Sequence, residues 1–264
     1  MEVGIIGAGP AGVAAASYLA RFGVSVTIYE KDDVGGLLGN AWKVENFPLV
    51  DPLDGPSLVE KLRRRLKDPG ITVRFEDVRR VRRKTVITDT SETAFDAVFV
   101  ATGTGPMRLP ELEVSDRVVY EYRRLPGDLR RLAVTGSGDA AFDGCIRALE
   151  TGCEVHLFAR GPAWKAVPHL VPRALDLGLQ PHPGQEILKV EKGEKTLTLT
   201  TSTGRTEVDA LLICIGRIPA LPELDPDGEA LVIGDAAHPH TRQASIAIGD
   251  GVRAAMELLR SAET

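Results

Sequence analysis

The chain has 264 residues, of which 43% are hydrophobic and 26% charged, and its formal net charge is −5. This composition is that of a soluble globular protein with one large or two modest domains. The acidic balance argues against nucleic acid as the main partner, because phosphate-binding surfaces are usually basic. No apolar run reaches the ~18 residues of a membrane span, and no leader-like segment precedes the first predicted strand. We therefore expect a cytoplasmic protein that does not enter a membrane.

The three cysteines, Cys145, Cys153 and Cys214, include no Cys-x-x-Cys pair and have no histidine-rich cluster beside them. A sparse, odd set of this kind makes neither a disulfide framework nor a zinc site. We expect reduced, buried thiols that behave as small apolar residues, and no bound metal. Asparagine and glutamine are scarce beside many Arg and Glu, which hints at a thermophilic source.

The first part of the chain is predicted to form a strand, a glycine-rich turn, a helix and a second strand. These elements are Glu2–Ile6, Gly7–Gly12, the Ala-rich stretch Ala11–Phe22 and the β-branched stretch Val24–Tyr29. Gly23 falls where a helix would end. The pattern is the βαβ unit of a doubly wound fold.

A second unit of the same kind begins near Leu132. Its predicted elements are a strand Leu132–Thr135, a turn Gly136–Ala141, a helix Asp139–Glu150 and a strand Glu154–Phe158. The same βαβ pattern has therefore occurred twice in one chain.

The duplication continues beyond the two turns. Each unit is followed by a helical stretch, by short β runs and by an apolar strand, which is Ala97–Ala101 in the first half and Ala210–Ile215 in the second. We predict an α/β protein with two Rossmann-like domains, the second inserted in the first. The first domain would comprise residues 1–107 and 217–264, and the inserted domain residues 108–216.

The first turn, Gly7-Ala8-Gly9-Pro10-Ala11-Gly12, is a dinucleotide-binding fingerprint. Its first glycine makes the tight turn, its second lets backbone approach a pyrophosphate, and its third packs helix on strand. The helix that follows would present its N–H groups to the phosphates. Glu30, 23 residues after Gly7, stands where an acid would bond the adenosine ribose hydroxyls. The alternative is an ordinary glycine turn beside a surface Glu30.

The second fingerprint is Gly136-Ser137-Gly138-Asp139-Ala140-Ala141, with Ala at the third glycine position. The strand after it ends in Phe158-Ala159-Arg160, and no acid stands where one would bond a ribose. Arg160, with Lys165 nearby, could instead meet a 2′-phosphate. The alternative is a degenerate fold that no longer binds nucleotide.

A third motif, Ile233-Gly234-Asp235-Ala236-Ala237, precedes the last predicted helix. Asp235 could accept hydrogen bonds from the polyol chain of a flavin, and a helix beginning near Arg242 would direct its positive end toward that flavin. Gly249 and Gly251 lie inside this helix, at a cost of ~1 kcal/mol each relative to Ala. Close packing against a cofactor or a neighbouring backbone would offset that cost.

Together these motifs resemble the low-molecular-weight thioredoxin reductase family over nearly the whole chain. Further matching stretches are Gly35-Gly36-Leu37-Leu38, Val44-Glu45-Asn46-Phe47-Pro48, Ala101-Thr102-Gly103 and Arg242-Gln243-Ala244. The resemblance implies FAD on the first domain, NADH or NADPH on the inserted domain, and often a homodimer.

The resemblance also implies the residues of each site. Those expected to hold FAD are Gly7, Gly9, Pro10, Ala11, Gly12, Glu30, Lys31, Gly36, Leu37, Asn46, Ala101, Thr102, Gly103, Gly234, Asp235, Arg242, Gln243 and Ala244. Those expected to hold NAD(P) are Gly136, Gly138, Asp139, Ala140, Ala141, Arg160 and Lys165.

One departure from the family bears directly on the chemistry. The family's Cys-x-x-Cys lies just before the second fingerprint, where this chain has Val119 and Tyr122. Other flavoprotein disulfide reductases carry a cysteine pair after the first Gly-Gly, and Leu37–Trp42 has none. Thiol–disulfide exchange requires a thiolate, so electron relay through an internal dithiol is excluded on chemical grounds.

The family's 2′-phosphate motif, His-Arg-Arg-x-x-x-Arg, is altered as well. Arg160 and Lys165 match its first and last Arg, while Ala159 and Gly161 replace the His and the second Arg. Lys does not reproduce a bidentate guanidinium clamp, so the choice between NADH and NADPH stays open.

The candidates for a catalytic role are His238, His240 and Tyr122. The two histidines follow Asp235 and could donate a proton at the flavin edge, although loop histidines are usually solvent-exposed. Tyr120 and Tyr122 could cover the flavin face that the cysteines would occupy, and ordinary core packing is the alternative.

Two basic runs are expected on the surface. One is Arg63-Arg64-Arg65 on a helix, and the other is Arg79–Lys84 on a β-hairpin. A solvated charged face is the default interpretation. The alternative is a docking patch for an acidic electron carrier such as ferredoxin or flavodoxin.

We therefore expect an FAD-dependent NAD(P)H oxidoreductase that passes electrons directly to an external acceptor, either a protein carrier or a small molecule. Ferredoxin–NADP reductases of the thioredoxin reductase type have this domain plan without the cysteine pair. The alternative is a non-catalytic flavin- or nucleotide-binding sensor or assembly factor on the same scaffold.

Overall fold

The computed structural model describes residues 1–47, 50–226 and 229–262. The chain forms two compact units. The first unit comprises Met1–Gly39, Val44–Gly105 and Arg217–Thr264, and the inserted unit comprises Asn40–Lys43 and Pro106–Gly216.

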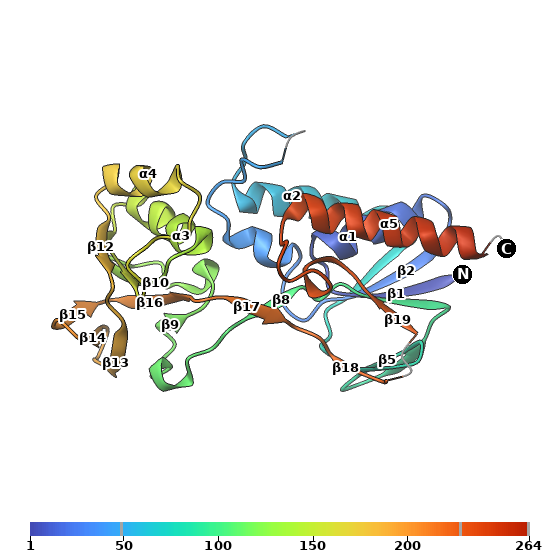
Figure 1. Cartoon of the computed structure of the whole chain (residues 1–264). Helices are drawn as coiled ribbons and strands as arrows, with labels where there is room; N and C mark the ends of the chain where they lie inside the picture. The colour runs from blue at the N-terminus through green and yellow to red at the C-terminus, as the bar shows by residue number, and fades with distance from the viewer. Residues whose placement is uncertain (48–49, 227–228, 263–264) are drawn as a thin grey trace. The chain divides into compact units, whose positions relative to one another are not determined.

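The first unit is built on a parallel five-stranded sheet with the order β19-β7-β1-β2-β3 (Figure 1). Its strands are β1 (Glu2–Ile6), β2 (Ser25–Tyr29), β3 (Ile71–Arg74), β7 (Ala97–Val100) and β19 (Ala230–Val232). Side chains alternate across a strand, so Ile5 and Ile6 point to opposite faces. Both side chains are buried, so both faces of the sheet are covered by other elements.

One face carries three helices (Figure 1), and Ile5 belongs to the core that they form with the sheet. These are α1 (Pro10–Ala20), α2 (Gly55–Arg65) and α5 (Ala244–Ala262). Ile6 packs on the other face against Val81 and Val86. These two valines belong to a four-stranded sheet of β18 (Glu223–Leu224), β4 (Val78–Arg82), β5 (Thr85–Thr88) and β6 (Glu92–Ala94).

The inserted unit repeats this plan. Its parallel sheet has the order β12-β11-β10-β16-β9, with strands β9 (Val118–Val119), β10 (Arg131–Gly136), β11 (Glu154–Ala159), β12 (Gln180–Pro183) and β16 (Ala210–Cys214). Helices α3 (Asp139–Glu150) and α4 (Leu170–Asp176) share a core with Leu132 and Val134. Ala133, between them, packs on the opposite face with an antiparallel sheet of β13 (Ile187–Lys192), β14 (Leu197–Thr201) and β15 (Arg205–Val208).

The remaining elements are short. A two-stranded sheet pairs β8 (Thr104–Pro106) with β17 (Arg217–Pro219). The 3-10 turns among the described residues are η1 (Gly36–Asn40), η2 (Pro110–Leu112), η3 (Tyr122–Arg124) and η4 (Gly234–Ala236). No helix in the described ranges is both long and apolar enough to cross a membrane.

The inserted unit also contains a short segment from the first half of the sequence, Asn40–Lys43. Its Trp42 backbone N–H donates to the Asp143 carboxylate at 2.7 Å, and its indole N–H donates to Glu150 at 2.5 Å. The Arg173 guanidinium lies 3.9 Å from the Trp42 ring centroid. Burial raises the pKa of Asp143 to about 6, against the opposing effect of hydrogen bonds from the backbone of Trp42 and Lys43.

The predicted βαβ elements are confirmed to within two residues at each end. The last helix, predicted to begin near Arg242, begins two residues later, at Ala244. Before it, the Ala237 and His238 N–H groups both donate to the Gly234 carbonyl, which forms the turn η4. The first helical bond is from the Ala247 N–H to the Gln243 carbonyl.

Candidate nucleotide-binding sites

Residues expected to hold a dinucleotide meet at one edge of the first unit's parallel sheet. Gly7 follows β1 and Glu30 follows β2, while Thr102 and Gly234 lie two residues after β7 and β19. All four strands run in the same direction, so their carboxyl ends share an edge. This edge is where open α/β sheets bind their ligands.

The fingerprint turn is held tightly on one side and is open on the other. Gly7 has a φ of +105°, and a Cβ on it would collide with the Ala101 carbonyl. A Cβ on Gly12 would collide with the Gly7 carbonyl. On Gly9, by contrast, a Cβ would meet no atom within 4 Å. The second glycine therefore faces space in which a phosphate could approach the backbone.

The N-terminus of α1 points its donors into the same region. Its N-cap is Gly9 and its first residue is Pro10, and no described side chain caps it. Its first turn contains no acidic residue. Unsatisfied N–H groups and the positive end of the helix dipole make such a terminus a binding site for anions.

Glu30 is a buried carboxylate at the end of β2, 8% exposed. One of its oxygens accepts the Ala8 N–H at 2.8 Å and the other accepts the Asp32 N–H at 2.9 Å. These bonds fix the carboxylate beside the fingerprint, and its remaining lone pairs can accept from hydroxyl groups. The alternative of a surface Glu30 is therefore wrong. Lys31 is the next residue and is exposed.

Thr102 supplies an unsatisfied buried group in this region. Its hydroxyl is buried and has no hydrogen-bond partner among the described residues. Buried polar groups are nearly always paired, so a lone hydroxyl beside an open fingerprint fits a polar ligand. Ala101 is buried ahead of it, and Gly103 follows with its carbonyl accepting the Ala220 N–H at 3.1 Å.

Two further predicted segments join this region. The Gly9 Cα lies 3.7 Å from where a Cβ of Gly36 would be, and Leu37 follows Gly36 in η1. The Asn46 amide donates to the Gln243 side-chain oxygen at 2.7 Å, which links two expected ligands 197 positions apart. Pro48, which belongs to the matching stretch around Asn46, lies outside the described residues.

The third motif contacts the first fingerprint directly. A Cβ on Gly234 would lie 2.8 Å from the Ala11 Cβ, and one on Gly251 would collide with the Ala11 carbonyl. Gly251 is therefore required for backbone packing, one of the two reasons expected. At Gly249 a Cβ would meet nothing within 4 Å, so close packing does not explain that glycine.

Asp235 is half-buried at the start of this turn. Burial raises its pKa, and the nearby guanidinium groups of Arg242 and Arg217 oppose that rise. Arg242 itself donates to the Pro239 carbonyl at 3.3 Å, and Ala244 begins α5. The carboxylate therefore lies beside two cations at the sheet edge, where it can accept hydrogen bonds.

Asp250 is a functional candidate that the sequence reasoning missed. It is 7% exposed, and it accepts the Gly234 N–H at 2.6 Å and an Arg253 N–H at 2.5 Å. Its carboxylate also lies 3.7 Å from the imidazole of His238. The only signal in the sequence is an acid between two glycines in a predicted helix.

The two candidate histidines differ in their surroundings. Both are exposed, but the His238 imidazole lies 3.7 Å from the Asp250 carboxylate. The Asp250 carboxylate can orient the His238 imidazole. Among the described residues, no ion pair involves His240. His238 is accordingly the better candidate of the two.

The inserted unit has the same arrangement at its own fingerprint. A Cβ on Gly136 would collide with the Cys214 carbonyl, as Gly7 would with Ala101, and a Cβ on Gly138 would meet nothing within 4 Å. Ala140 is exposed and Ala141 is buried at the start of α3.

The segment that carries Lys165 is attached to this fingerprint. The Lys165 N–H donates to the Ser137 carbonyl at 2.7 Å, and the Val167 N–H donates to the Asp139 carboxylate at 2.8 Å. Arg160, directly after β11, is exposed. Both basic residues are thus available near the carboxyl ends of β10 and β11.

The positions that replace the family's cysteines lie in the inserted unit. Val119 is buried in β9, and Tyr122 begins η3 with the Arg147 guanidinium 4.4 Å from its ring centroid. Burial raises the pKa of the Tyr122 phenol, which keeps it protonated at neutral pH. Tyr120 donates to Glu113 at 2.7 Å and accepts the Leu109 N–H at 2.7 Å, so its hydroxyl has a structural role.

The three cysteines form no disulfide. Cys145 and Cys153 are buried, and Cys214 is partly exposed. Burial raises the pKa of Cys145 well above its usual range and that of Cys153 to about 11. Both are therefore thiols rather than thiolates at neutral pH.

The basic runs are largely compensated by acidic neighbours. Arg79, Arg80, Arg82 and Lys84 each have a carboxylate within 3.4 Å, and Arg63 has one at 2.8 Å. The hairpin predicted over Arg79–Lys84 is confirmed as β4 and β5. Its surface charges are mixed, which favours the interpretation of a solvated charged face.

Known proteins resemble this chain over its whole length. The profile of the pyridine nucleotide-disulphide oxidoreductase family matches residues 1–262. A thioredoxin reductase of Ureaplasma parvum is 33% identical over 177 residues, which cover 63% of this chain and 57% of that protein. A bifunctional thioredoxin reductase/thioredoxin of Mycobacterium leprae is 29% identical over 98% of this chain and 65% of that protein. The chain thus matches less than two thirds of the length of either relative.

Among solved structures, Lactococcus lactis thioredoxin reductase in its FR conformation superposes with a TM-score of 0.86 at 22% identity, covering 98% of both chains. This likeness confirms the predicted α/β fold with two Rossmann-like domains. The chain belongs to the pyridine nucleotide-disulphide oxidoreductase family and is thioredoxin reductase-like. Proteins of this kind bind FAD together with NADPH or NADH.

Proposed function

We propose that the chain is an FAD-dependent NAD(P)H oxidoreductase that delivers electrons directly to an external acceptor and uses no internal dithiol. The observation that carries this proposal is a nucleotide-binding fingerprint in each unit, combined with Val119 and Tyr122 at the positions of the family's cysteines. When bound, FAD supplies the acceptance of a hydride from the nicotinamide and the release of electrons. The protein contributes binding, orientation and electrostatics.

FAD would occupy the edge of the first unit. Three observations fit it: the open space beside Gly9, the unpaired buried hydroxyl of Thr102, and the fixed carboxylate of Glu30. The α1 N-terminus would hold the pyrophosphate, and Glu30 would bond the ribose. Asp235 would accept from the polyol chain. The other predicted FAD residues are proposed to complete this site.

NADH or NADPH would bind the inserted unit, with its pyrophosphate at the open Gly138 and the N-terminus of α3. Arg160 would meet a 2′-phosphate, and Lys165 would support it. The first unit is then the FAD domain and the inserted unit is the nicotinamide domain. Their bounds differ from the predicted residues 1–107 plus 217–264 and 108–216, because the inserted unit begins at Pro106 and also includes Asn40–Lys43.

His238 is the residue we propose for proton transfer near the flavin. Asp250 would hold its imidazole in place, because the two side chains lie 3.7 Å apart and the carboxylate is fixed by Gly234 and Arg253. Loss of the Asp250 carboxylate would therefore remove the group that orients the His238 imidazole.

The acceptor is proposed to be a small molecule in preference to an acidic protein carrier. The compensated charges of Arg79 to Lys84 support this choice, since steering of an acidic partner needs a net positive patch.

A thiol count tests the absence of a dithiol relay. The purified flavoprotein is denatured anaerobically, before and after reduction by NADH or NADPH, and its thiols are titrated. The proposal expects all three cysteines as thiols in both samples. A thioredoxin reductase with its cysteine pair is the control and should gain two thiols on reduction. A gain of two in this chain would contradict the proposal.

A further inference from the structure

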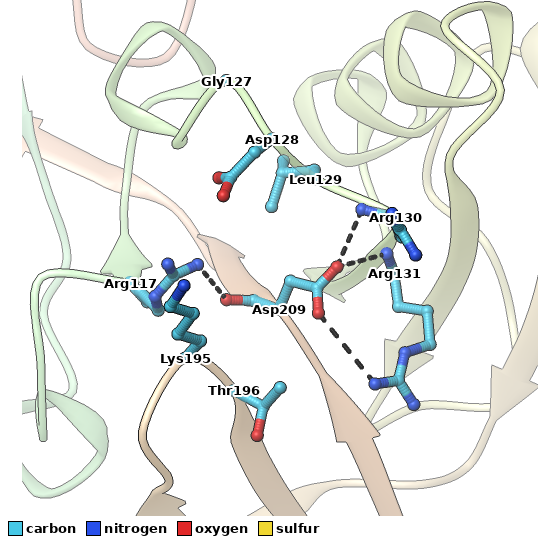
Figure 2. A pocket seen from close by; sticks show the side chains of 9 residues that line it. All are labelled: Arg117, Gly127, Asp128, Leu129, Arg130, Arg131, Lys195, Thr196 and Asp209. Atoms are coloured by element: carbon cyan, nitrogen blue, oxygen red, sulfur yellow. Dashed lines mark hydrogen bonds and ion pairs between the residues drawn. The ribbon is translucent and has the colours of Figure 1, made fainter.

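The inserted unit has a cationic hollow that the proposed chemistry does not use. It has a volume of about 640 Å³, within the range of small-molecule sites. Figure 2 shows the residues that line it, which are Arg117, Gly127, Asp128, Leu129, Arg130, Arg131, Lys195, Thr196 and Asp209.

The hollow is remote from the nucleotide fingerprint of the same unit. Arg131 begins β10 and Asp209 directly precedes β16, so the hollow lies at the amino ends of these parallel strands. Gly136 and Cys214, which end the same strands, lie at the opposite edge. The predicted NAD(P) site therefore does not include this hollow.

The Asp209 carboxylate is already used in hydrogen bonds within the protein. One of its carboxylate oxygens accepts the Arg130 N–H at 2.7 Å and the Arg131 N–H at 2.9 Å (Figure 2). The Arg131 guanidinium pairs with Glu207 at 2.9 Å and lies 4.0 Å from Asp209. The positive charge of Arg131 is thus compensated by Glu207 and Asp209.

Three other cations in the hollow are not compensated in this way. Arg117 donates to the Asp209 backbone carbonyl at 3.1 Å, which orients its guanidinium but does not neutralise it. Within the described ranges, no salt bridge involves Arg117, Arg130 or Lys195. Asp128 is the one other acid that lines the hollow, and no dashed line in Figure 2 reaches it.

These cations come from separate parts of the chain. Arg117 precedes β9, Arg130 precedes β10, and Lys195 lies in the turn between β13 and β14. Three positive groups line this hollow with Asp128 as the one further acid, and a doubly negative ligand would bring the net charge there closer to zero. Arginine forks bind phosphate and carboxylate oxygens in pairs, and the Thr196 hydroxyl offers one more donor.

We infer that this hollow is a binding site for a small dianion, a phosphate monoester or a dicarboxylate. Both classes of ligand carry two negative charges on oxygen atoms that lie close to each other. Arg117 and Lys195 would recognise these oxygens. The site is independent of the flavin chemistry proposed above, so it stands or fails without it.

Backbone amide NMR of the FAD-loaded protein tests the inference. NAD⁺ is kept saturating so that both fingerprints are filled, and ionic strength is held constant with chloride. Inorganic phosphate and malonate are titrated separately at pH 7.5. We expect saturable shifts at Arg130, Arg131 and Thr196, with phosphate alone indicating a phosphate ester and malonate alone a dicarboxylate.

Variants then assign the binding to these side chains. Arg117→Gln with Lys195→Gln should weaken dianion binding by roughly tenfold or more. Lys195→Gln alone changes an exposed turn residue and should weaken it with the fold intact. The control is Arg64→Gln with Arg65→Gln, two basic residues of a different hollow on α2, which should leave binding unchanged. Absence of saturable shifts with both anions, or equal loss in the control, would overturn the inference.

Discussion

The backbone of Gly251 in α5 lies directly against the carbonyl group of Ala11 in α1. A Cβ on Gly251 would be 3.0 Å from the Ala11 carbonyl carbon and closer still to its oxygen. The last helix of the chain thereby packs against the first turn of the fingerprint helix. Its position depends on one missing methyl group.

Substitution of this glycine should destabilise the protein. Gly251→Ala must displace α5 from α1, and we expect a loss of about 2–3 kcal/mol in the free energy of unfolding. Gly249→Ala is the matched control in the same helix, where a Cβ meets open space. The free energy of unfolding of this control should rise by about 0.5–1 kcal/mol, because Ala favours a helix more than Gly does. Denaturant unfolding measures both, and equal effects of the two substitutions would refute the packing argument.

Gly9→Val should abolish FAD retention while leaving the fold intact. A side chain here meets no protein atom within 4 Å but would occupy the space proposed for the pyrophosphate. The thermal unfolding of the flavin-free variant should match that of flavin-free wild type. Purification of a fully yellow variant would show that FAD lies elsewhere.

Asp143 should make stability depend on pH in a predictable direction. Its folded pKa of about 6 exceeds the usual 3.8, so the folded state binds more protons between these values. Its contribution is therefore greatest at low pH and is lost as pH rises through about 6. When the pH is lowered from 7.5 to 5, the free energy of unfolding of wild type should increase by about 1 kcal/mol relative to that of Asp143→Asn.

Equilibrium unfolding of both proteins at the two pH values measures this difference, and other titrating groups cancel in the comparison. A difference between the proteins that did not change with pH, or that changed in favour of Asp143→Asn at pH 5, would contradict the burial argument.

Arg160 and Lys165 should set the choice of nicotinamide. Arg160→Ala and Lys165→Ala should each lower the NADPH to NADH ratio of kcat/KM, by about tenfold for Arg160 and less for Lys165. Stopped-flow reduction with each donor measures the ratio. An unchanged ratio in both variants would remove the 2′-phosphate role.

The sequence alone was sufficient to predict the periodic elements and both fingerprints. Strand and helix periodicity are local, and the Gly7 and Gly136 turns have a spacing that few other structures require. The prediction that Glu30 stands where an acid would bond a ribose rested on spacing, and its buried carboxylate does lie beside the first fingerprint. Helix α5, predicted to begin near Arg242, begins two residues later at Ala244, after the η4 turn in which the Ala237 and His238 N–H groups donate to the Gly234 carbonyl.

Other features depend on contacts between distant residues, which local patterns do not encode. The roles of Gly249 and Gly251 were indistinguishable in the sequence, and only the approach of Ala11 separates them. No local pattern marks Asp250 as a functional residue, because its partner Gly234 lies 16 positions away. The anchoring of Trp42 on Asp143 spans 101 positions and likewise had no signal.

Anaerobic titration of the purified flavoprotein with NADH and with NADPH tests the central claim most directly. Flavin absorbance reports the transfer from nicotinamide, and an added acceptor reports the onward transfer. We predict that at least one donor bleaches the flavin within seconds and that a small-molecule acceptor restores its colour without thioredoxin. A bound flavin that neither donor reduces would contradict the proposed reductase and favour a non-catalytic role.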